Sequence, residues 1–242
     1  MFRDLVSNSK HCTTEKTFSV DLKKVVDLAR HVDENIQMKG RDAPRALHPA
    51  GFVFHESRCG STLVANALAA MDPMKNRVYS ESAPPIAALK LCGIDGELCS
   101  KETAAELFRD VVYMMRRTDN PVEENVFFKI QSMGTKYIDT FLRAYPETPW
   151  IFVFRDPVQV MMSQLKYGPQ RANCVHQLSD VSKSTHEHLA SIGRKLNSLI
   201  PEEKCALHLV RYEFSSFRIC WIEYLSVFII SSYLHFFSFF KK

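Results

Sequence analysis

Short runs with the character of buried strands alternate with helix-forming stretches along most of the chain. Five such runs, bounded by turn residues, cover residues 51–55, 77–79, 126–130, 150–154 and 206–210. In the first helix-forming stretch apolar residues recur at helical spacing, and the others are rich in residues that favour helices. Helices are therefore predicted over residues 18–38, 63–71, 103–117, 135–144, 157–166 and 178–198. This alternation indicates an α/β fold with a central parallel sheet flanked by helices on both faces.

Polar and charged residues directly follow the first four predicted strands. They are residues 58–62, then Ser80 and Glu81, then residues 129–132, and Arg155. In open parallel sheets, ligands bind at the carboxyl ends of the strands. These positions are therefore candidate ligand-binding residues before any motif is considered.

The first of these loops, HESRCGST at residues 55–62, has the layout of a phosphate-binding loop between a strand and a helix. A Walker A motif also needs a Lys before the Ser/Thr and a Gly five positions ahead of the second Gly. Here Ser61 follows Gly60 directly, and His55 occupies the earlier position. ATP or GTP hydrolysis is poorly supported, but the start of the helix, together with Arg58, can bind an anion.

Two segments together resemble the P-loop sulfotransferases. Residues 58–63, RCGSTL, are similar to the loop that binds the 5′-phosphosulfate in these enzymes, commonly RSGST or RSGTT. Residues 155–163, RDPVQVMMS, are similar to the segment that binds the 3′-phosphate of the donor, with an Arg at a strand end and a Ser on the next helix. The Arg-type loop looks closest to the tyrosylprotein and bacterial enzymes, and the resemblance covers about residues 48–213.

The resemblance implies a three-layer P-loop NTPase-like fold. It also implies transfer of a sulfuryl group from 3′-phosphoadenosine 5′-phosphosulfate, the co-substrate, to a hydroxyl acceptor. An in-line displacement of this kind needs no metal where cations and backbone donors stabilise the charge. Tyr212, in VRYE, matches a family segment that packs near the adenine. The donor-binding residues implied here are Arg58, Cys59, Gly60, Ser61, Thr62, Leu63, Arg155, Ser163 and Tyr212.

Three residues are the catalytic candidates that the resemblance implies. Arg58 and Lys129 would stabilise charge on the transferring group. Glu81, in YSESAPP, stands where related enzymes place a catalytic Glu, and it would accept the acceptor's proton if burial raises its pKa. Two structural interpretations of Glu81 stay open: an exposed loop residue, or an ion-pair partner of Arg77.

Composition narrows the class of protein. Hydrophobic residues make up 46% of the 242 positions and charged residues 24%, which is ordinary for a globular chain. The net charge of +4 is spread along the chain, which argues against a nucleic-acid partner. No apolar signal segment is visible near Met1.

The seven cysteines include no CxxC pair, so we expect no metal site and reduced thiols in a cytoplasmic protein. Cys59 invites a nucleophile hypothesis, because a helix N-terminus lowers the pKa of a thiol. A small residue that the family tolerates at this position is the better interpretation.

The last 29 residues, 214–242, hold no Gly, Pro or Asp, and Glu223 is the only formal charge over residues 219–240. A helix over residues 219–240 would reach about 33 Å, enough to cross a bilayer. Membrane attachment is thus one interpretation, and a core element of the domain is another. We favour a third, an aberrant ending, because the family resemblance stops after Glu213.

The expected organisation has three regions: an N-terminal helix and loop over residues 1–47, a C-terminally incomplete sulfotransferase-like domain over 48–213, and the apolar tail. Two other functions stay open. One is another P-loop nucleotide-binding protein such as a small kinase, against which the missing Walker lysine counts. The other is an inactive, truncated sulfotransferase-like protein.

Overall fold

The computed structural model describes residues 20–36, 44–92, 98–176, 183–209 and 229–230. Its centre is a parallel sheet with the strand order β3-β5-β2-β6-β7. The strands are β2 (Pro49–His55), β3 (Asn76–Ser80), β5 (Asn125–Lys129), β6 (Trp150–Val153) and β7 (Ile229–Ile230). The predicted α/β class is confirmed, and so are the first four strands to within two residues.

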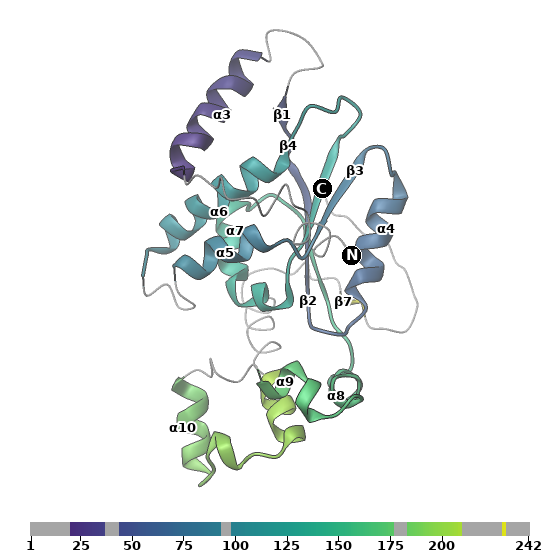
Figure 1. Ribbon diagram of the computed structural model, residues 1–242, viewed down its shortest axis with the longest axis vertical. Coiled ribbons are helices and arrows are strands. Elements are labelled where there is room, and N and C mark those ends of the chain that lie inside the picture. Colours follow the sequence, from purple (N-terminus) through teal and green to yellow (C-terminus); the bar gives the residue numbers. More distant parts are fainter. Residues whose placement is uncertain (1–19, 37–43, 93–97, 177–182, 210–228, 231–242) are drawn as a thin grey trace, which may run out of the picture.

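Helices cover both faces of the sheet (Figure 1). One face carries α5 (Ala83–Leu91), α6 (Lys101–Arg116) and α7 (Ile138–Ala144), the last preceded by a 3₁₀ turn over Ser132–Tyr137. The other face carries α4 (Ser61–Met71). Alternate residues of each strand point to opposite faces, so Phe52 and Phe54 pack towards α6 and α7, whereas Val53 packs with Leu68 of α4.

Aromatic side chains fill the larger core. Phe54, Phe108, Phe128 and Phe141 are at most 1% exposed, and Phe54 and Phe141 meet edge to face with ring centroids 5.0 Å apart. Truncating one of these rings to Ala would cost about 3–5 kcal/mol. This core holds the strands in register and therefore sets the positions of their carboxyl ends.

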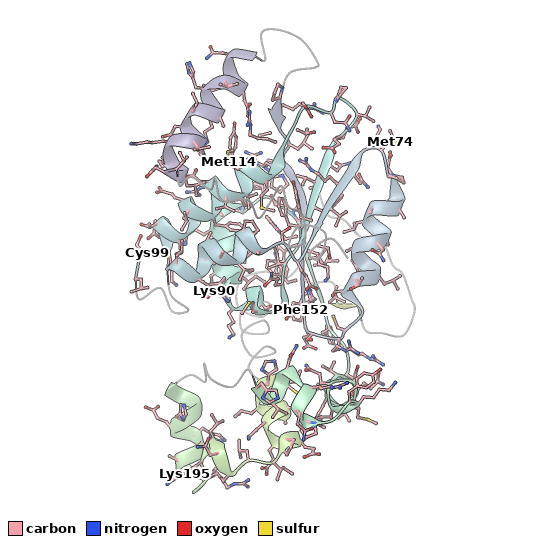
Figure 2. The ribbon with its side chains drawn as sticks, viewed as in Figure 1. Met74, Lys90, Cys99, Met114, Phe152 and Lys195 are labelled. Atoms are coloured by element: carbon pink, nitrogen blue, oxygen red, sulfur yellow. A yellow bond between two sulfur atoms is a disulfide. The ribbon has the colours of Figure 1, made fainter. Side chains whose placement is uncertain are left out.

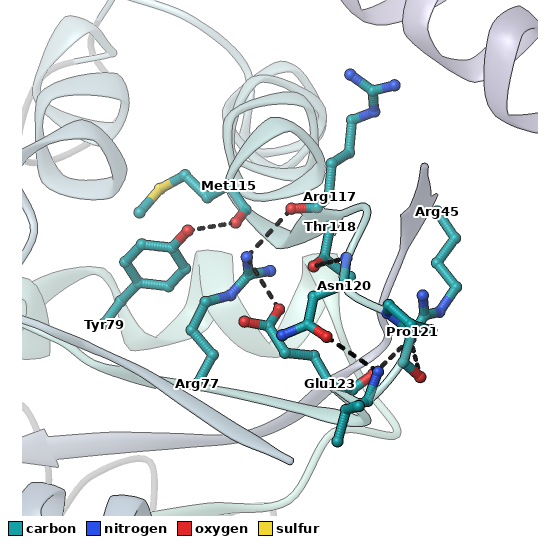
Figure 3. Close-up of polar contacts among 10 residues, drawn as sticks. Arg45, Arg77, Tyr79, Met115, Arg117, Thr118, Asn120, Pro121 and Glu123 are labelled. Atoms are coloured by element: carbon teal, nitrogen blue, oxygen red, sulfur yellow. Dashed lines mark hydrogen bonds and ion pairs between the residues drawn. The ribbon is translucent and has the colours of Figure 1, made fainter. Parts of the chain in front are cut away.

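Hydrogen bonds and ion pairs connect the segments at the amino ends of the strands. There β1 (Arg45–Ala46) pairs antiparallel with β4 (Arg117–Thr118). Figure 3 shows Arg77 of β3 donating to the carbonyl oxygen of Arg117 and forming an ion pair with Glu123, with an Nη1–Oε2 distance of 3.3 Å. The N-terminal helix α3 (Leu22–Ile36) packs on α6 beside this network.

A second group of helices lies beyond the carboxyl ends of the strands (Figure 1). It contains α8 (Pro157–Leu165), α9 (Asn173–His176), α10 (Lys183–Ser191), 3₁₀ turns at Pro169–Arg171 and Leu196–Ser198, and helical residues 201–209. In Figure 2, Lys195 lies in this group, Phe152 lies in the sheet, and Met74 lies at the opposite end of the molecule.

Two predicted elements in this helical group are wrong. Residues 206–209 are helical rather than a fifth strand, and β7 takes the place beside β6. The buried residues Cys205, His208 and Leu209 are three and four positions apart, which is helical spacing that a short apolar run conceals. The predicted helix over residues 178–198 is interrupted where Gly193 has φ 69°.

The prediction of reduced thiols is also wrong for four cysteines. Cys92 is bonded to Cys99, and Cys174 to Cys205, with Cα–Cα distances of 5.1 and 4.7 Å. Spacing along the chain could not show these pairs, because the fold alone brings the partners together. The second disulfide joins α9 to the helical residues 201–209 and is fully buried.

Tyr212 and nearly all of the apolar tail lie outside the described residues. From residues 214–242 the structure describes the two residues of β7, which extend the sheet beside β6. Within the described part of the chain, no helix is both long and apolar enough to cross a bilayer.

Candidate functional site

The loop between β2 and α4 forms one wall of the site. Gly60 is the N-cap of α4, with φ 93° and no side-chain cap. A Cβ at Gly60 would meet nothing within 4 Å, so glycine is required for its backbone conformation and the space beside the loop is open. The N–H of Leu63 bonds to the carbonyl oxygen of Gly60, and the Leu63 side chain is exposed. The N–H groups of Ser61 and Thr62 thus remain to bind an anion at the helix start.

Backbone conformation singles out two of the sequence candidates. Among the described residues, Arg58 and Glu81 are the two non-glycine residues with positive φ, at 66° and 58°. This conformation costs such residues about 1 kcal/mol. Backbone of this kind clusters at functional sites, where the surrounding structure holds it in place.

A hydrogen bond joins the two motifs that resemble sulfotransferase segments. Nε of Arg58, in the phosphate-binding loop, donates to Oγ of Ser163 on α8 at 3.2 Å. The two residues are 105 positions apart in the sequence. Their meeting follows from the parallel sheet, because β2 and β6 are neighbours and both end at this edge.

Arg155 lies where β6 passes into α8. Its Nε donates to Oε1 of Gln159 at 2.8 Å, and Asp156 caps α8 by accepting from the N–H of Gln159 at 3.0 Å. Within the described part of the chain, Arg155 has no hydrogen bond to Arg58 or to Ser163. Its guanidinium is fixed at the start of the same helix that carries Ser163.

The backbone of Glu81 is anchored to the end of β5. Its N–H donates to the carbonyl oxygen of Lys129 at 2.8 Å, and its own carbonyl oxygen accepts from Nε2 of Gln131 at 2.9 Å. These bonds explain how Glu81 keeps a left-handed conformation. Gln131 lies in the range 129–132 that the sequence analysis marked as candidate ligand-binding positions, and here it supports the backbone of Glu81.

Two nitrogen atoms lie close to one oxygen of the Glu81 side chain. Nζ of Lys129 forms an ion pair with Oε1, and Nε2 of His55 lies 3.4 Å from the same oxygen. The side chains of Lys129 and His55 are 1% and 5% exposed, whereas that of Glu81 is 47% exposed. Arg77 does not compete for Glu81, because it is paired with Glu123.

The electrostatics differ from what the sequence analysis expected. The close contact with His55, together with that with Lys129, outweighs partial burial and lowers the pKa of Glu81 to about 2. The upward shift on which the role of a base was conditional is therefore not found: the pKa is lowered instead. Burial acts to lower the pKa of His55, but its contacts with Cys59 and Glu81 raise the pKa to about 9.

Sequence reasoning missed His55 as a member of this cluster. Its position was noted only as the place where a Walker glycine is absent. One signal was available: His55 is a polar residue at the carboxyl end of an apolar strand, where ligand-binding residues are expected. That it meets Glu81 depends on β3 and β2 lying on either side of β5.

Cys59 packs away from the open side of the loop. It is 6% exposed, lies in the core cluster with Val53 and Leu68, and its Sγ donates to the carbonyl oxygen of Glu56 at 3.0 Å. A buried thiol held in this way is not presented to a substrate. Among the described residues, no group of three or more His, Cys, Asp or Glu side chains could hold a metal ion.

No protein-family model matches the chain, and no curated protein sequence matches it. The function is therefore argued from the residues of the site.

Proposed function

We propose that the protein is a sulfotransferase with a P-loop fold, which transfers a sulfuryl group from 3′-phosphoadenosine 5′-phosphosulfate to a hydroxyl acceptor. The observation that carries the proposal is the hydrogen bond between Arg58 and Ser163. It brings together the residues proposed to bind the two phosphate-bearing ends of one nucleotide. A chance resemblance in two distant segments would not require them to meet.

The proposed donor site uses fixed positive groups. Arg58 and the N–H groups of Ser61 and Thr62 bind the 5′-phosphosulfate, since a guanidinium and a helix start both favour oxyanions. Arg155 and Ser163 bind the 3′-phosphate, and Ser163 exchanges its bond with Arg58 for one with the ligand.

The proposed transfer uses Glu81 and Lys129. Glu81 accepts the proton of the acceptor hydroxyl while the acceptor oxygen forms a bond to sulfur. The bond from sulfur to the bridging phosphate oxygen breaks, and Arg58 stabilises the charge of the departing phosphate. Lys129 turns from Glu81 to the sulfuryl oxygens, and the loss of this neighbouring cation raises the pKa of Glu81 from its lowered value.

Isothermal titration calorimetry with adenosine 3′,5′-bisphosphate tests the donor site. We expect a Kd on the order of micromolar without metal, and weaker binding of Mg-ATP. Arg58→Ala should weaken binding about tenfold or more, because a charged hydrogen-bond donor is lost. Arg143→Ala, an exposed arginine that pairs with Glu102 on another face, is the matched control.

A second titration separates the two motifs. Arg155→Ala should reduce the preference for nucleotides that carry a 3′-phosphate, whereas Lys166→Ala, at the other end of α8, should leave it unchanged. Unchanged discrimination in Arg155→Ala would remove the second motif from the proposal. Tighter binding of Mg-ATP than of the bisphosphate would favour a kinase-like protein instead.

A further inference from the structure

One histidine in the site has a fixed ring and a charged neighbour but no role in the proposed function. His55 ends β2 and is 4% exposed. Its Nδ1 lies 2.7 Å from the carbonyl oxygen of Glu56. A carbonyl oxygen only accepts hydrogen bonds, so Nδ1 carries a hydrogen and Nε2 is left to face Glu81.

The two partners of Glu81 differ in their freedom to move. Lys129 holds its charge at the end of a flexible four-carbon stem, which can turn to an incoming anion. The imidazole of His55 has no such reach, because its ring has no flexible stem and its other nitrogen is bonded to the backbone carbonyl oxygen of Glu56. When Lys129 turns away, His55 is the partner that stays with Oε1 of Glu81.

We propose that His55 is a positioning residue for the transfer reaction, holding the Glu81 carboxylate at the acceptor while Lys129 contacts the sulfuryl group. This inference rests on the proposed function and adds to it a residue outside both sulfotransferase-like motifs. Glu81 needs such a partner because its side chain is half exposed and its other oxygen, Oε2, has no donor among the described residues.

The groups that contact His55 determine its pKa, so its titration reports on these contacts. The groups that face it are the Cys59 thiol in the loop, Glu81 after β3, Lys129 on β5 and the Glu56 carbonyl group. Glu81 is the acidic side chain among these contacts, so replacing it should release the proton of His55 at a lower pH. The raised pKa of His55, about 9, agrees with a ring that has Nδ1 at the Glu56 carbonyl oxygen and Nε2 3.4 Å from the Glu81 carboxylate.

Two substitutions of His55 distinguish a role in positioning Glu81 from a role in packing. The amide of Asn reaches the place of Nδ1, and the longer Gln reaches the place of Nε2. His55→Asn thus keeps the contact with the Glu56 carbonyl and loses Glu81, whereas His55→Gln keeps Glu81. We expect His55→Asn to lower kcat about tenfold with the donor KM unchanged, and His55→Gln to lose less than about threefold. His48→Gln, whose ring also contacts a backbone carbonyl oxygen, is the control.

Equal losses in both variants would overturn the inference and leave the proposed sulfotransferase function standing. If the wild-type protein shows no sulfuryl transfer with binding of the bisphosphate also absent, the proposed function fails. Kinetics cannot then test the role of His55. The contact between His55 and Glu81 is therefore also tested by a measurement that needs no activity.

Nuclear magnetic resonance on the full chain with ¹⁵N-labelled histidine provides that test. The His55 signals, assigned by their loss in His55→Gln, should titrate well above the usual range in the wild type. In Glu81→Gln the titration should fall by at least about one pH unit, since one unit corresponds to about 1.4 kcal/mol of interaction. An unchanged titration would show that His55 does not hold Glu81, and the inference would be wrong whatever the activity.

Discussion

Asp33 and Glu81 are two carboxylates that the fold treats differently. Asp33, on α3, is 5% exposed and uses both oxygens: Arg117 donates to Oδ1 at 2.7 Å and to Oδ2 at 3.0 Å, and Tyr113 donates to Oδ2. Lys129 and His55 both contact a single oxygen of Glu81, and the Glu81 side chain is half exposed. Asp33 lies inside a helix, whereas Glu81 has a left-handed backbone.

The difference separates a carboxylate that fastens the fold from one that can react. Both oxygens of Asp33 accept hydrogen bonds. Burial, together with the hydrogen bond to Asp33, raises the pKa of Tyr113 to about 12. Tyr113 therefore keeps its proton at physiological pH. Glu81 has two basic neighbours at one oxygen, and its other oxygen has no donor among the described residues. The predictions below test this contrast, from the largest expected effect to the smallest.

Glu81→Gln should have the largest effect on activity. Loss of a general base lowers kcat by about 10²–10⁴, while binding of adenosine 3′,5′-bisphosphate should change little. Steady-state kinetics and calorimetry on the same preparation measure the two quantities. Glu102→Gln, an exposed glutamate in an ion pair with Arg143, is the control. A kcat within a fewfold of wild type would exclude Glu81 as the base.

Asp33→Ala should have the largest effect on stability. It leaves Arg117 and Tyr113 without their shared acceptor in a buried site, which should lower the free energy of unfolding by about 3 kcal/mol. Urea denaturation measures the change, and Asp27→Ala on the exposed face of α3 is the control. Activity per folded molecule should be unchanged, and a large loss of kcat would contradict the purely structural role.

Arg58→Gly and Arg58→Ala should differ in stability although both lose the donor contact. Glycine adopts φ 66° without strain, so Arg58→Gly should be about 1 kcal/mol more stable than Arg58→Ala. Thermal unfolding of the two variants measures the difference. Equal stabilities would mean that the loop relaxes when the arginine is removed.

The pH dependence of stability should show the smallest effect. His55 has a raised pKa, so its contribution is complete below about pH 6.5 and is lost as pH rises through about 9. Glu81 has a lowered pKa, so its contribution is present above about pH 4.5 and is lost as pH falls towards 2. Between pH 6.5 and 9 we expect the free energy of unfolding to fall, measured by denaturant titrations. In His55→Asn this loss should largely disappear.

The sequence predicted the residues of the site better than it predicted the helices after β6 and the disulfides. The residues Arg58, Gly60, Glu81, Lys129 and Arg155 lie at the carboxyl ends of strands as expected, because short apolar runs followed by polar residues mark those ends clearly. The helix over residues 201–209 was missed, because the five-residue run 206–210 fits a strand and a helix equally well. The two disulfides were missed because cysteine pairing depends on how the fold places the thiols, even for Cys92 and Cys99, which are seven positions apart.

By itself, the sequence determined the α/β class, the first four strands and the loop geometry that glycine permits at position 60. These depend on local periodicity and on single-residue conformational preferences. Only the tertiary structure decided that Arg58 meets Ser163 and that His55 and Lys129 share one oxygen of Glu81. The order of strands in the sheet sets these contacts, and no local pattern encodes which strands become neighbours. The tertiary structure also set the pKa of Glu81, because a pKa depends on the groups that the fold places around it.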